Sequence, residues 1–251
     1  MFRLNKSERA PLLCYVTDRR TLSTEEFAGA REAEAPESVP QKSRKPQAHE
    51  PEARKTLLQR IEDAAAAGVD WIQIREKDLS GKECSLLALE ALQRAATSAA
   101  GEAARARILL NDRLDVALAM QAGGVHLGEK SVPAQEARRL VLSLHREENF
   151  LIGVSCHSLE AAKAAERGGA DYLFFGPVFA TRSKAAYGAP QGLERLAEVC
   201  RAVSISVLAI GGITLENCAA CFSAGASGIA AIGLFQDAKD LPAVVQTLRK
   251  P

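Results

Sequence analysis

The alternation of strand-sized and helix-sized segments constrains the fold of this chain more than any other feature. Eight short apolar runs alternate with amphipathic segments, from residues 12–17 to a final predicted helix at 237–249. Strands that are each followed by a helix pair in parallel, and eight such units favour a closed barrel over an open sheet. The 251 residues also match the roughly 250 of such barrels. We predict one domain, a TIM (β/α)8 barrel spanning residues 1–251.

The predicted strands lie at 12–17, 69–75, 107–110, 124–128, 150–154, 171–175, 206–210 and 227–232. The predicted helices lie at 55–67, 81–99, 133–145, 158–167, 192–202, 215–224 and 237–249, and a further helix, which Asn111-Asp112 can cap, runs through Met120. A glycine-containing turn precedes four strands (67–70, 122–125, 169–172 and 224–228), which indicates a repeated βα unit in which glycine ends the helix.

Residues 29–54, between the first strand and the first helix, break the rhythm. Four of the ten prolines fall there, among mixed charges and almost no large apolar side chains. Such a segment buries too little surface to offset its ordering entropy. We predict an extended, flexible insertion, and a role as a lid or partner-binding segment stays open as the alternative.

Composition excludes several classes of function. The formal net charge is +1, so no overall field favours nucleic acid or a membrane, and an anion would need a local cluster of cations. The N-terminal residues lack the apolar core of a signal peptide, and no apolar run is long enough to span a bilayer. We expect a cytoplasmic protein whose six cysteines are reduced, and a homo-oligomer stays open.

The stretch Trp71-Ile-Gln-Ile-Arg-Glu-Lys77 is the most informative strand. Alternation sends Ile72 and Ile74 to one face and Gln73, Arg75 and Lys77 to the other. An unpaired buried charge is costly, so two inward-facing cations predict an anionic ligand. The alternative is a solvated pair of cations on the surface.

Further polar residues and glycines follow the other strands, where the active site of such barrels lies. They are Asn111 and Asp112, His126, Gly128 and Glu129, Ser155 and His157, Gly176, Thr181, Ser183 and Lys184, Gly211 and Gly212, and Ile232 and Gly233. The loops after strands seven and eight commonly bind phosphate in such barrels. Together with the two cations of the second strand and with Lys184 and the two loop hydroxyls, Gly211-Gly212 therefore predicts a ligand or ligands with at least two phosphate groups. Asp112 also offers an oxygen ligand to Mg²⁺.

Each of these residues also has a structural interpretation. Asp112 and Ser158 are typical helix N-caps, His126 is typical of a hydrogen-bonded core residue, and Gly211-Gly212 of a tight turn. Trp71 is expected in the core. Cys218-Ala-Ala-Cys221 lies in a predicted helix without the further ligands that zinc requires, so we interpret it as ordinary helical sequence.

An ordered set of motifs resembles the superfamily of thiamine phosphate synthase and the thiazole tautomerase TenI. The motifs are Tyr15-Val-Thr-Asp18, Gln73-Ile-Arg-Glu-Lys77, Asn111-Asp-Arg-Leu-Asp115, Gly124-Val-His-Leu-Gly128, Gly153-Val-Ser-Cys-His157, Gly169-Ala-Asp-Tyr172, Gly176-Pro-Val-Phe179, Thr181-Arg-Ser-Lys184 and Ala209-Ile-Gly-Gly-Ile213. They cover nearly the whole chain except 29–54.

The resemblance implies a transferase of thiamine biosynthesis, which joins hydroxymethylpyrimidine diphosphate to thiazole phosphate and releases pyrophosphate. It implies a Mg²⁺ ligand at Asp112, charge stabilisation by Arg75, Lys77 and Lys184, and phosphorylated small molecules as substrates. The substrate-binding positions would be Gln73, Ile74, Arg75, Glu76, Lys77, Asn111, Ser155, Thr181, Arg182, Ser183, Lys184, Gly211, Gly212, Ile232 and Gly233.

Two positions depart from the synthase pattern. Ser131 stands where the family usually has a second Mg²⁺-binding aspartate, and Gly233 where it has a serine. Both departures favour the alternative of a metal-independent tautomerase, an isomerase in which His157 would transfer a proton. A non-catalytic binder of phosphorylated ligands stays open as a second alternative.

Overall fold

Eight parallel strands form a closed barrel in the computed structural model, which describes residues 10–22, 50–97, 106–181 and 189–250. The strands pair in chain order, and β8 closes on β1. Their bounds are β1 Leu12–Val16, β2 Trp71–Ile74, β3 Arg107–Asn111, β4 Gly124–Leu127, β5 Leu151–Cys156, β6 Tyr172–Phe175, β7 Ser206–Ile210 and β8 Gly228–Ala231. The predicted barrel is confirmed.

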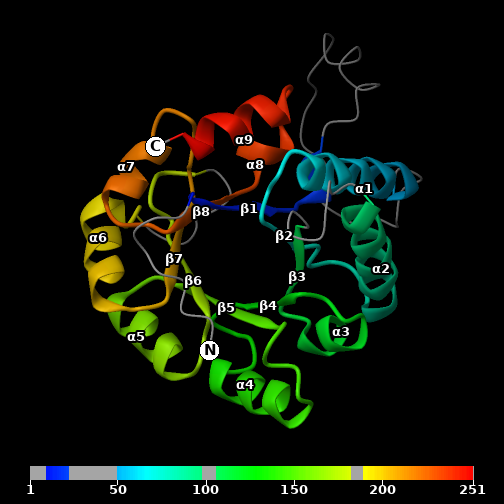
Figure 1. Ribbon diagram of the computed structural model, residues 1–251, viewed down its shortest axis with the longest axis horizontal. Coiled ribbons are helices and arrows are strands. Elements are labelled where there is room, and N and C mark those ends of the chain that lie inside the picture. Colours follow the sequence, from blue (N-terminus) through cyan, green and yellow to red (C-terminus); the bar gives the residue numbers. More distant parts are fainter. Residues whose placement is uncertain (1–9, 23–49, 98–105, 182–188, 251) are drawn as a thin grey trace, which may run out of the picture.

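The helices form a ring outside the strands (Figure 1). They are α1 Glu50–Ala66, α2 Gly81–Thr97, α3 Leu114–Ala119, α4 Ala134–Ser143, α5 Leu159–Arg167, α6 Gly192–Ala202, α7 Cys218–Ser223, α8 Gly233–Gln236 and α9 Leu241–Arg249, with a 3-10 turn, η1, at Arg19–Thr21. None of the described helices is long and apolar enough to cross a membrane.

The last predicted helix, 237–249, is wrong at its start. The chain forms α8 directly after β8 and begins α9 only at Leu241. The side chain of Asp240 accepts a hydrogen bond from the Ala243 N–H at 3.0 Å, and Pro242 occupies the first turn. An N-cap followed by proline is a strong helix start, and it fixes the boundary there.

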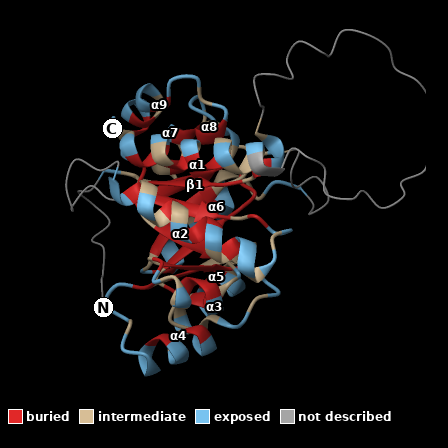
Figure 2. Ribbon diagram, turned by 90° about the vertical axis from the view of Figure 1, so that its right-hand side faces the viewer, coloured by how far each residue is buried: buried red, intermediate tan, exposed pale blue. Residues whose placement is uncertain are grey.

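The strand alternation separates two apolar layers, as predicted for β2. Ile72 and Ile74 pack outward under the helices, whereas Trp71 faces the barrel interior with Tyr172, at a ring-centroid distance of 4.6 Å. Figure 2 shows the buried strands between helices whose outer faces are exposed. Inward-facing side chains fill the interior, so ligands are confined to its ends.

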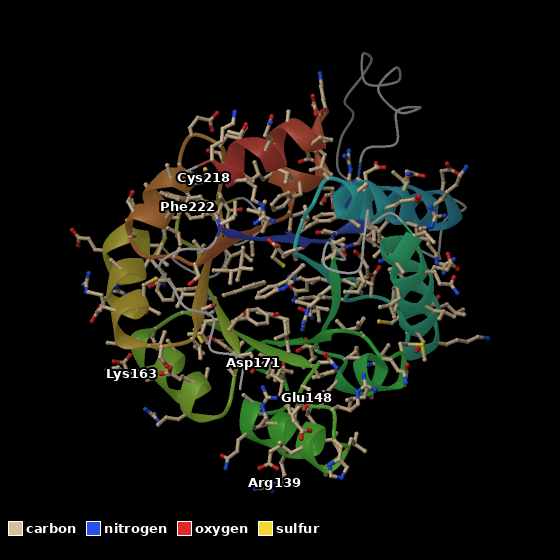
Figure 3. The ribbon with its side chains drawn as sticks, viewed as in Figure 1. Arg139, Glu148, Lys163, Asp171, Cys218 and Phe222 are labelled. Carbon is tan, nitrogen blue, oxygen red and sulfur yellow. The ribbon has the colours of Figure 1, made fainter. Side chains whose placement is uncertain are left out.

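The repeated glycine turns belong to the N-terminal end of the barrel. Gly68, Gly169 and Gly225 take φ values of +90°, +86° and +95°, which favour glycine. The turn at 122–125 differs, because Gln121, just before it, has the positive φ (+56°). In the turn at 169–172, Asp171 (labelled in Figure 3) accepts hydrogen bonds from the Ile152 N–H and from Arg138, which ties β5 to the helix ring.

The predicted insertion, 29–54, extends too far at its C-terminal end. Residues 29–49 lie outside the described residues, whereas residues 50–54 form the first turns of α1. Proline at position 51 is compatible with that turn, because the N–H groups there have no intrahelical acceptor.

We predict that deleting residues 31–48 leaves a cooperatively folding barrel, because the composition of this segment offers little apolar surface to bury. Urea unfolding followed by circular dichroism should give a midpoint close to that of the full chain. Loss of soluble protein, or a much lower midpoint, would show that the segment packs on the barrel.

All six cysteines are free thiols, and all six are buried. Cys218 and Cys221 lie in α7, in the outer ring (Figure 3), and both are buried. No group of three or more metal-ligating side chains occurs among the residues that the structure describes. The prediction that Cys218 and Cys221 lie in a helix is confirmed.

Candidate active site

Neighbouring strands bring the predicted polar residues together at one end of the barrel. Strand pairing sets Asn111 of β3 beside His126 of β4, and Gln73 of β2 beside Leu109, two residues before Asn111. Ser155 of β5 follows on the next strand, where it contacts His126. The carboxyl ends of parallel strands meet at one edge, so residues far apart in the sequence share one site.

Three side chains form a chain of hydrogen bonds whose direction is fixed. The carboxylate of Asp112 only accepts, so the Asn111 amide donates to it at 3.2 Å. The Asn111 carbonyl oxygen then accepts from Gln73 Nε2 at 3.0 Å. Gln73 is 2% exposed, and its Oε1 has no partner among the described residues. A buried acceptor without a protein partner is available to a donor from a water molecule or a ligand.

Arg75 and Lys77 are unpaired cations at the end of β2. Neither side chain has an ion-pair partner among the residues that the structure describes. The pKa of Lys77 is held below its ordinary value, chiefly because Arg75 lies beside it and secondly by partial burial, whereas Asp112 acts in the opposite direction. Two neighbouring cations that repel each other and have no ion-pair partner among the described residues suit a site that takes an anion.

Glu76 points away from this site, contrary to the expectation that it contacts the substrate. Its side chain is 1% exposed and pairs with the Arg19 guanidinium at 3.0 Å. The Thr17 hydroxyl donates to it at 2.6 Å and accepts from the Arg75 N–H at 3.0 Å. Alternation explains the direction, since Glu76 lies between two inward-facing cations. The Ile74 side chain is also outside the barrel, so only its backbone faces the site.

A clamp formed by Arg19, Thr17 and Glu76 therefore fixes the end of β2. Arg19 also binds Asp78 through both terminal nitrogens, at 2.8 and 2.9 Å, and this interaction is the main cause that lowers the pKa of Asp78. Gln236 of α8 holds the adjoining turn through the Asp18 carbonyl. Sequence reasoning missed this clamp, although an outward-facing Glu76 on a buried strand required a cationic partner.

Asp112 is not a helix cap. It has a φ of +63°, and α3 begins after Arg113, which is its N-cap residue. The Ser131 hydroxyl donates to the Asp112 carboxylate and accepts from the Gly128 N–H at 2.6 Å. The left-handed backbone thus presents the carboxylate to the site, beside the residue that replaces the second family aspartate. Ser158, in contrast, caps α5 as predicted, accepting from the Ala161 N–H at 3.1 Å.

The glycines after β7 permit close backbone approach. A Cβ on Gly211 would lie 2.6 Å from Pro177 Cβ, and one on Gly212 would lie 2.8 Å from Phe179 Cβ. Asn217 donates to the Gly212 carbonyl at 2.9 Å and supports the turn. The tight turn is therefore real, and it packs against the loop after β6. Ile232 and Gly233 start at the neighbouring strand end, where Gly233 is exposed and Ile232 packs on the interior layer.

His157 lies at the end of β5 with both ring nitrogens near oxygen atoms. Its Nδ1 contacts the Gly176 carbonyl, and its Nε2 is 3.9 Å from the Glu129 carboxylate. Glu129 is exposed, so this pair borders the site without being sealed in it. Thr181 is half-buried on the loop after β6, and Arg182, Ser183 and Lys184 lie outside the described residues.

Several known proteins are similar to this chain in sequence and in fold. The family model described as thiamine monophosphate synthase matches residues 46–235. A thiamine-phosphate synthase of Methanoculleus marisnigri is 45% identical over 186 residues, covering 74% of this chain and 83% of that protein. One of Moorella thermoacetica is 41% identical over 193 residues, covering 77% and 87%.

A solved structure extends the likeness to nearly the full length. The thiamine phosphate pyrophosphorylase from Pyrococcus furiosus superposes with a TM-score of 0.70 at 30% identity, covering 95% of this chain and 93% of that one. The barrel, the motifs at its strand ends and these relatives agree. The chain belongs to the thiamine monophosphate synthase family and is a transferase.

Proposed function

We propose that this chain joins hydroxymethylpyrimidine diphosphate to thiazole phosphate and releases pyrophosphate. One observation carries the proposal: Arg75 and Lys77, which have no ion-pair partner among the described residues, follow the buried Gln73, whose Oε1 has no hydrogen-bond partner there either. The cations suit the diphosphate, and the acceptor suits the amino group of the pyrimidine. A substrate carrying both groups satisfies all three side chains at once.

The reaction separates charge, and the site matches both signs. Cleavage of the bond to pyrophosphate builds negative charge on the leaving group, which Arg75 and Lys77 stabilise from fixed positions. The pyrimidine retains positive charge, which its own amino group delocalises while Gln73 Oε1 accepts from that group. The thiazole nitrogen then forms the new bond to the pyrimidine methylene carbon, so orientation of the two substrates supplies much of the remaining rate.

The residues present fit Mg²⁺ with a reduced carboxylate set. Mg²⁺ is commonly held by one or two carboxylates together with substrate phosphates and water. Asp112 would hold it, and its direct hydrogen bonds from Asn111 and Ser131 keep the carboxylate oriented. When bound, the ion would neutralise charge on the diphosphate. Because Ser131 supplies no charge, affinity depends more on the substrate phosphates than in a two-carboxylate site.

We predict that Ser131→Asp tightens Mg²⁺ binding in the absence of substrate by about tenfold, or ~1.4 kcal/mol, because it adds a second carboxylate beside Asp112. Calorimetric titration of the substrate-free protein with Mg²⁺ measures this directly. Gln135→Asp, an exposed position on α4, is the matched control for added charge. Equal affinity in both variants would show that the side chain at position 131 does not reach the metal ion.

Turnover tests the proposal directly. Thiamine phosphate should appear when the protein is given pyrimidine diphosphate, thiazole phosphate and Mg²⁺, and chelation should stop it. No product under these conditions would overturn the synthase assignment.

The tautomerase alternative rests on the contact between His157 and Glu129 and on the single carboxylate at the metal position. Chelator-insensitive conversion of the thiazole carboxylate phosphate isomer, without thiamine phosphate formation, would establish it. His157→Gln would then abolish that conversion. Binding of either phosphate without any turnover would favour the non-catalytic binder.

A further inference from the structure

Three side chains inside the barrel, Tyr172, His126 and Ser155, form a second hydrogen-bonded chain, which leads from the barrel interior to the candidate active site. The Tyr172 hydroxyl of β6 lies 3.1 Å from His126 Nδ1, and His126 Nε2 lies 2.9 Å from Ser155 Oγ. Tyr172 and His126 are 1% and 2% exposed, whereas Ser155 is only half-buried at the end of β5. The chain therefore runs from a dry interior towards the ligand.

The position of the protons follows from the partners of Tyr172. Among the residues described, the only hydrogen-bonding partner of its hydroxyl is His126 Nδ1. Burial holds the pKa of Tyr172 well above its ordinary value, so the hydroxyl keeps its proton. That proton must point at Nδ1, because a buried donor without an acceptor is costly.

The direction then passes to Ser155. An imidazole ring in which one nitrogen accepts a hydrogen bond carries its N–H on the other nitrogen. If Nδ1 accepts from Tyr172, the N–H is on Nε2 and donates to Ser155 Oγ. Because His126 Nε2 donates to Ser155 Oγ, the Ser155 hydroxyl does not donate to His126. Its proton is left to donate to a ligand in the site, where Arg75 and Lys77 also favour an anion.

Packing holds this arrangement in place. The His126 ring lies 4.0 Å from the Phe174 ring, centroid to centroid, and a Cβ on Gly153 would collide with the Tyr172 ring. Gly153 pairs directly with both residues, with His126 across β4 and with Tyr172 across β6. The missing side chain at Gly153 is what lets the tyrosine hydroxyl reach the histidine.

We propose that Tyr172 and His126 are positioning residues that hold the Ser155 hydroxyl as a hydrogen-bond donor to the pyrophosphate portion of the ligand. The proposal rests on the proposed function for the identity of that anion. The tyrosine sets the tautomer of the histidine, and the histidine sets the orientation of the serine. Neither residue needs to contact the reacting atoms.

The tautomer is measurable without any variant. The chain has four histidines, so 15N–1H NMR of uniformly labelled protein resolves His126, which His126→Gln assigns by loss of one signal set. The expected result is a neutral ring with the proton on Nε2. A proton on Nδ1, or on both nitrogens, would overturn the proposal. Because this measurement uses the unaltered protein, it does not depend on whether the Tyr172→Phe variant folds.

The consequence for binding is tested with inorganic pyrophosphate by calorimetry. Tyr172→Phe should weaken binding roughly tenfold, the usual scale for a hydrogen bond to a charged group. It should have no further effect in a Ser155→Ala background, because the two residues act as one unit. Additive losses would overturn the proposal.

Tyr15→Phe is the matched control, since Tyr15 is another buried tyrosine, whose hydroxyl donates to Gln236 Oε1 at 3.0 Å. It should leave the His126 tautomer and the pyrophosphate affinity unchanged, and an equal loss in both tyrosine variants would overturn the proposal. If the unaltered protein does not bind pyrophosphate, the proposed function fails together with the ligand assigned to Ser155. If it binds pyrophosphate but His126 is the Nδ1–H tautomer, only the positioning proposal fails.

Discussion

Replacing Lys77 with alanine is expected to lower turnover by roughly a thousandfold, the upper range for removing one preorganised charge-stabilising group. The leaving pyrophosphate then faces Arg75 alone at the end of β2. The fold should be unaffected, because Lys77 is exposed and has no ion-pair partner among the described residues. Its removal also relieves the repulsion by which Arg75 lowers the pKa of Lys77.

Steady-state kinetics and urea unfolding together check this prediction. Lys82→Ala is the matched control, since Lys82 is an exposed lysine in the first turn of α2, outside the site. The control should retain full activity. A Lys77→Ala enzyme with an unchanged kcat/KM would contradict the assignment of the end of β2 as the diphosphate site.

Replacing Glu76 with alanine is expected to have the largest effect on stability. The change leaves the buried Arg19 guanidinium with only the half-exposed Asp78 as its partner. Breaking a buried ion pair by removing one member costs about 3–5 kcal/mol, and the remaining Asp78 contact places this case near 3 kcal/mol. For a protein of this size that corresponds to a Tm lower by roughly 6–12 °C.

Thermal unfolding of Glu76→Ala and Glu90→Ala compares a buried pair with a surface pair. Glu90 pairs with Arg54 at 2.7 Å, but both side chains are more than a third exposed, so its loss should cost less than about 1 kcal/mol. Equal Tm values for the two variants would show that the clamp contributes no net stability. Residual Glu76→Ala protein that folds should also lose affinity for pyrophosphate, because Arg75 is anchored through Thr17.

The barrel was predictable because its determinants are local. Strand alternation, helix-sized segments and glycine turns are read within a few residues, and their order implies parallel pairing. Errors occurred where two local signals competed. Helical periodicity from residue 237 competes with the Asp240 cap and Pro242, which start α9 later, and the prolines of the insertion include position 51, which is tolerated in the first turn of α1.

Part of the site was equally predictable. The inward direction of Gln73 follows from the twofold periodicity of β2, which ends at Ile74, whereas the same direction for Arg75 and Lys77 stays a prediction. The same periodicity directs Glu76 outward, where it pairs with Arg19, so its predicted contact with the substrate conflicts with the strand pattern. Resemblance between motifs does not distinguish a residue that binds a ligand from a neighbour that holds the strand in place.

The sequence by itself determined the architecture and the end of the barrel where the candidate site lies, and it singled out Arg75 and Lys77 as the proposed anion-binding cations. Only the tertiary structure decided which groups are already paired. Arg19 meets Glu76 across 57 positions, Ser131 meets Asp112 across 19, and Tyr172 meets His126 across 46. Such pairings depend on barrel closure and register rather than on local periodicity. Among the described residues they leave Gln73 Oε1 without a hydrogen-bond partner, and Arg75 and Lys77 without an ion-pair partner, and these are the groups that we propose the substrate contacts.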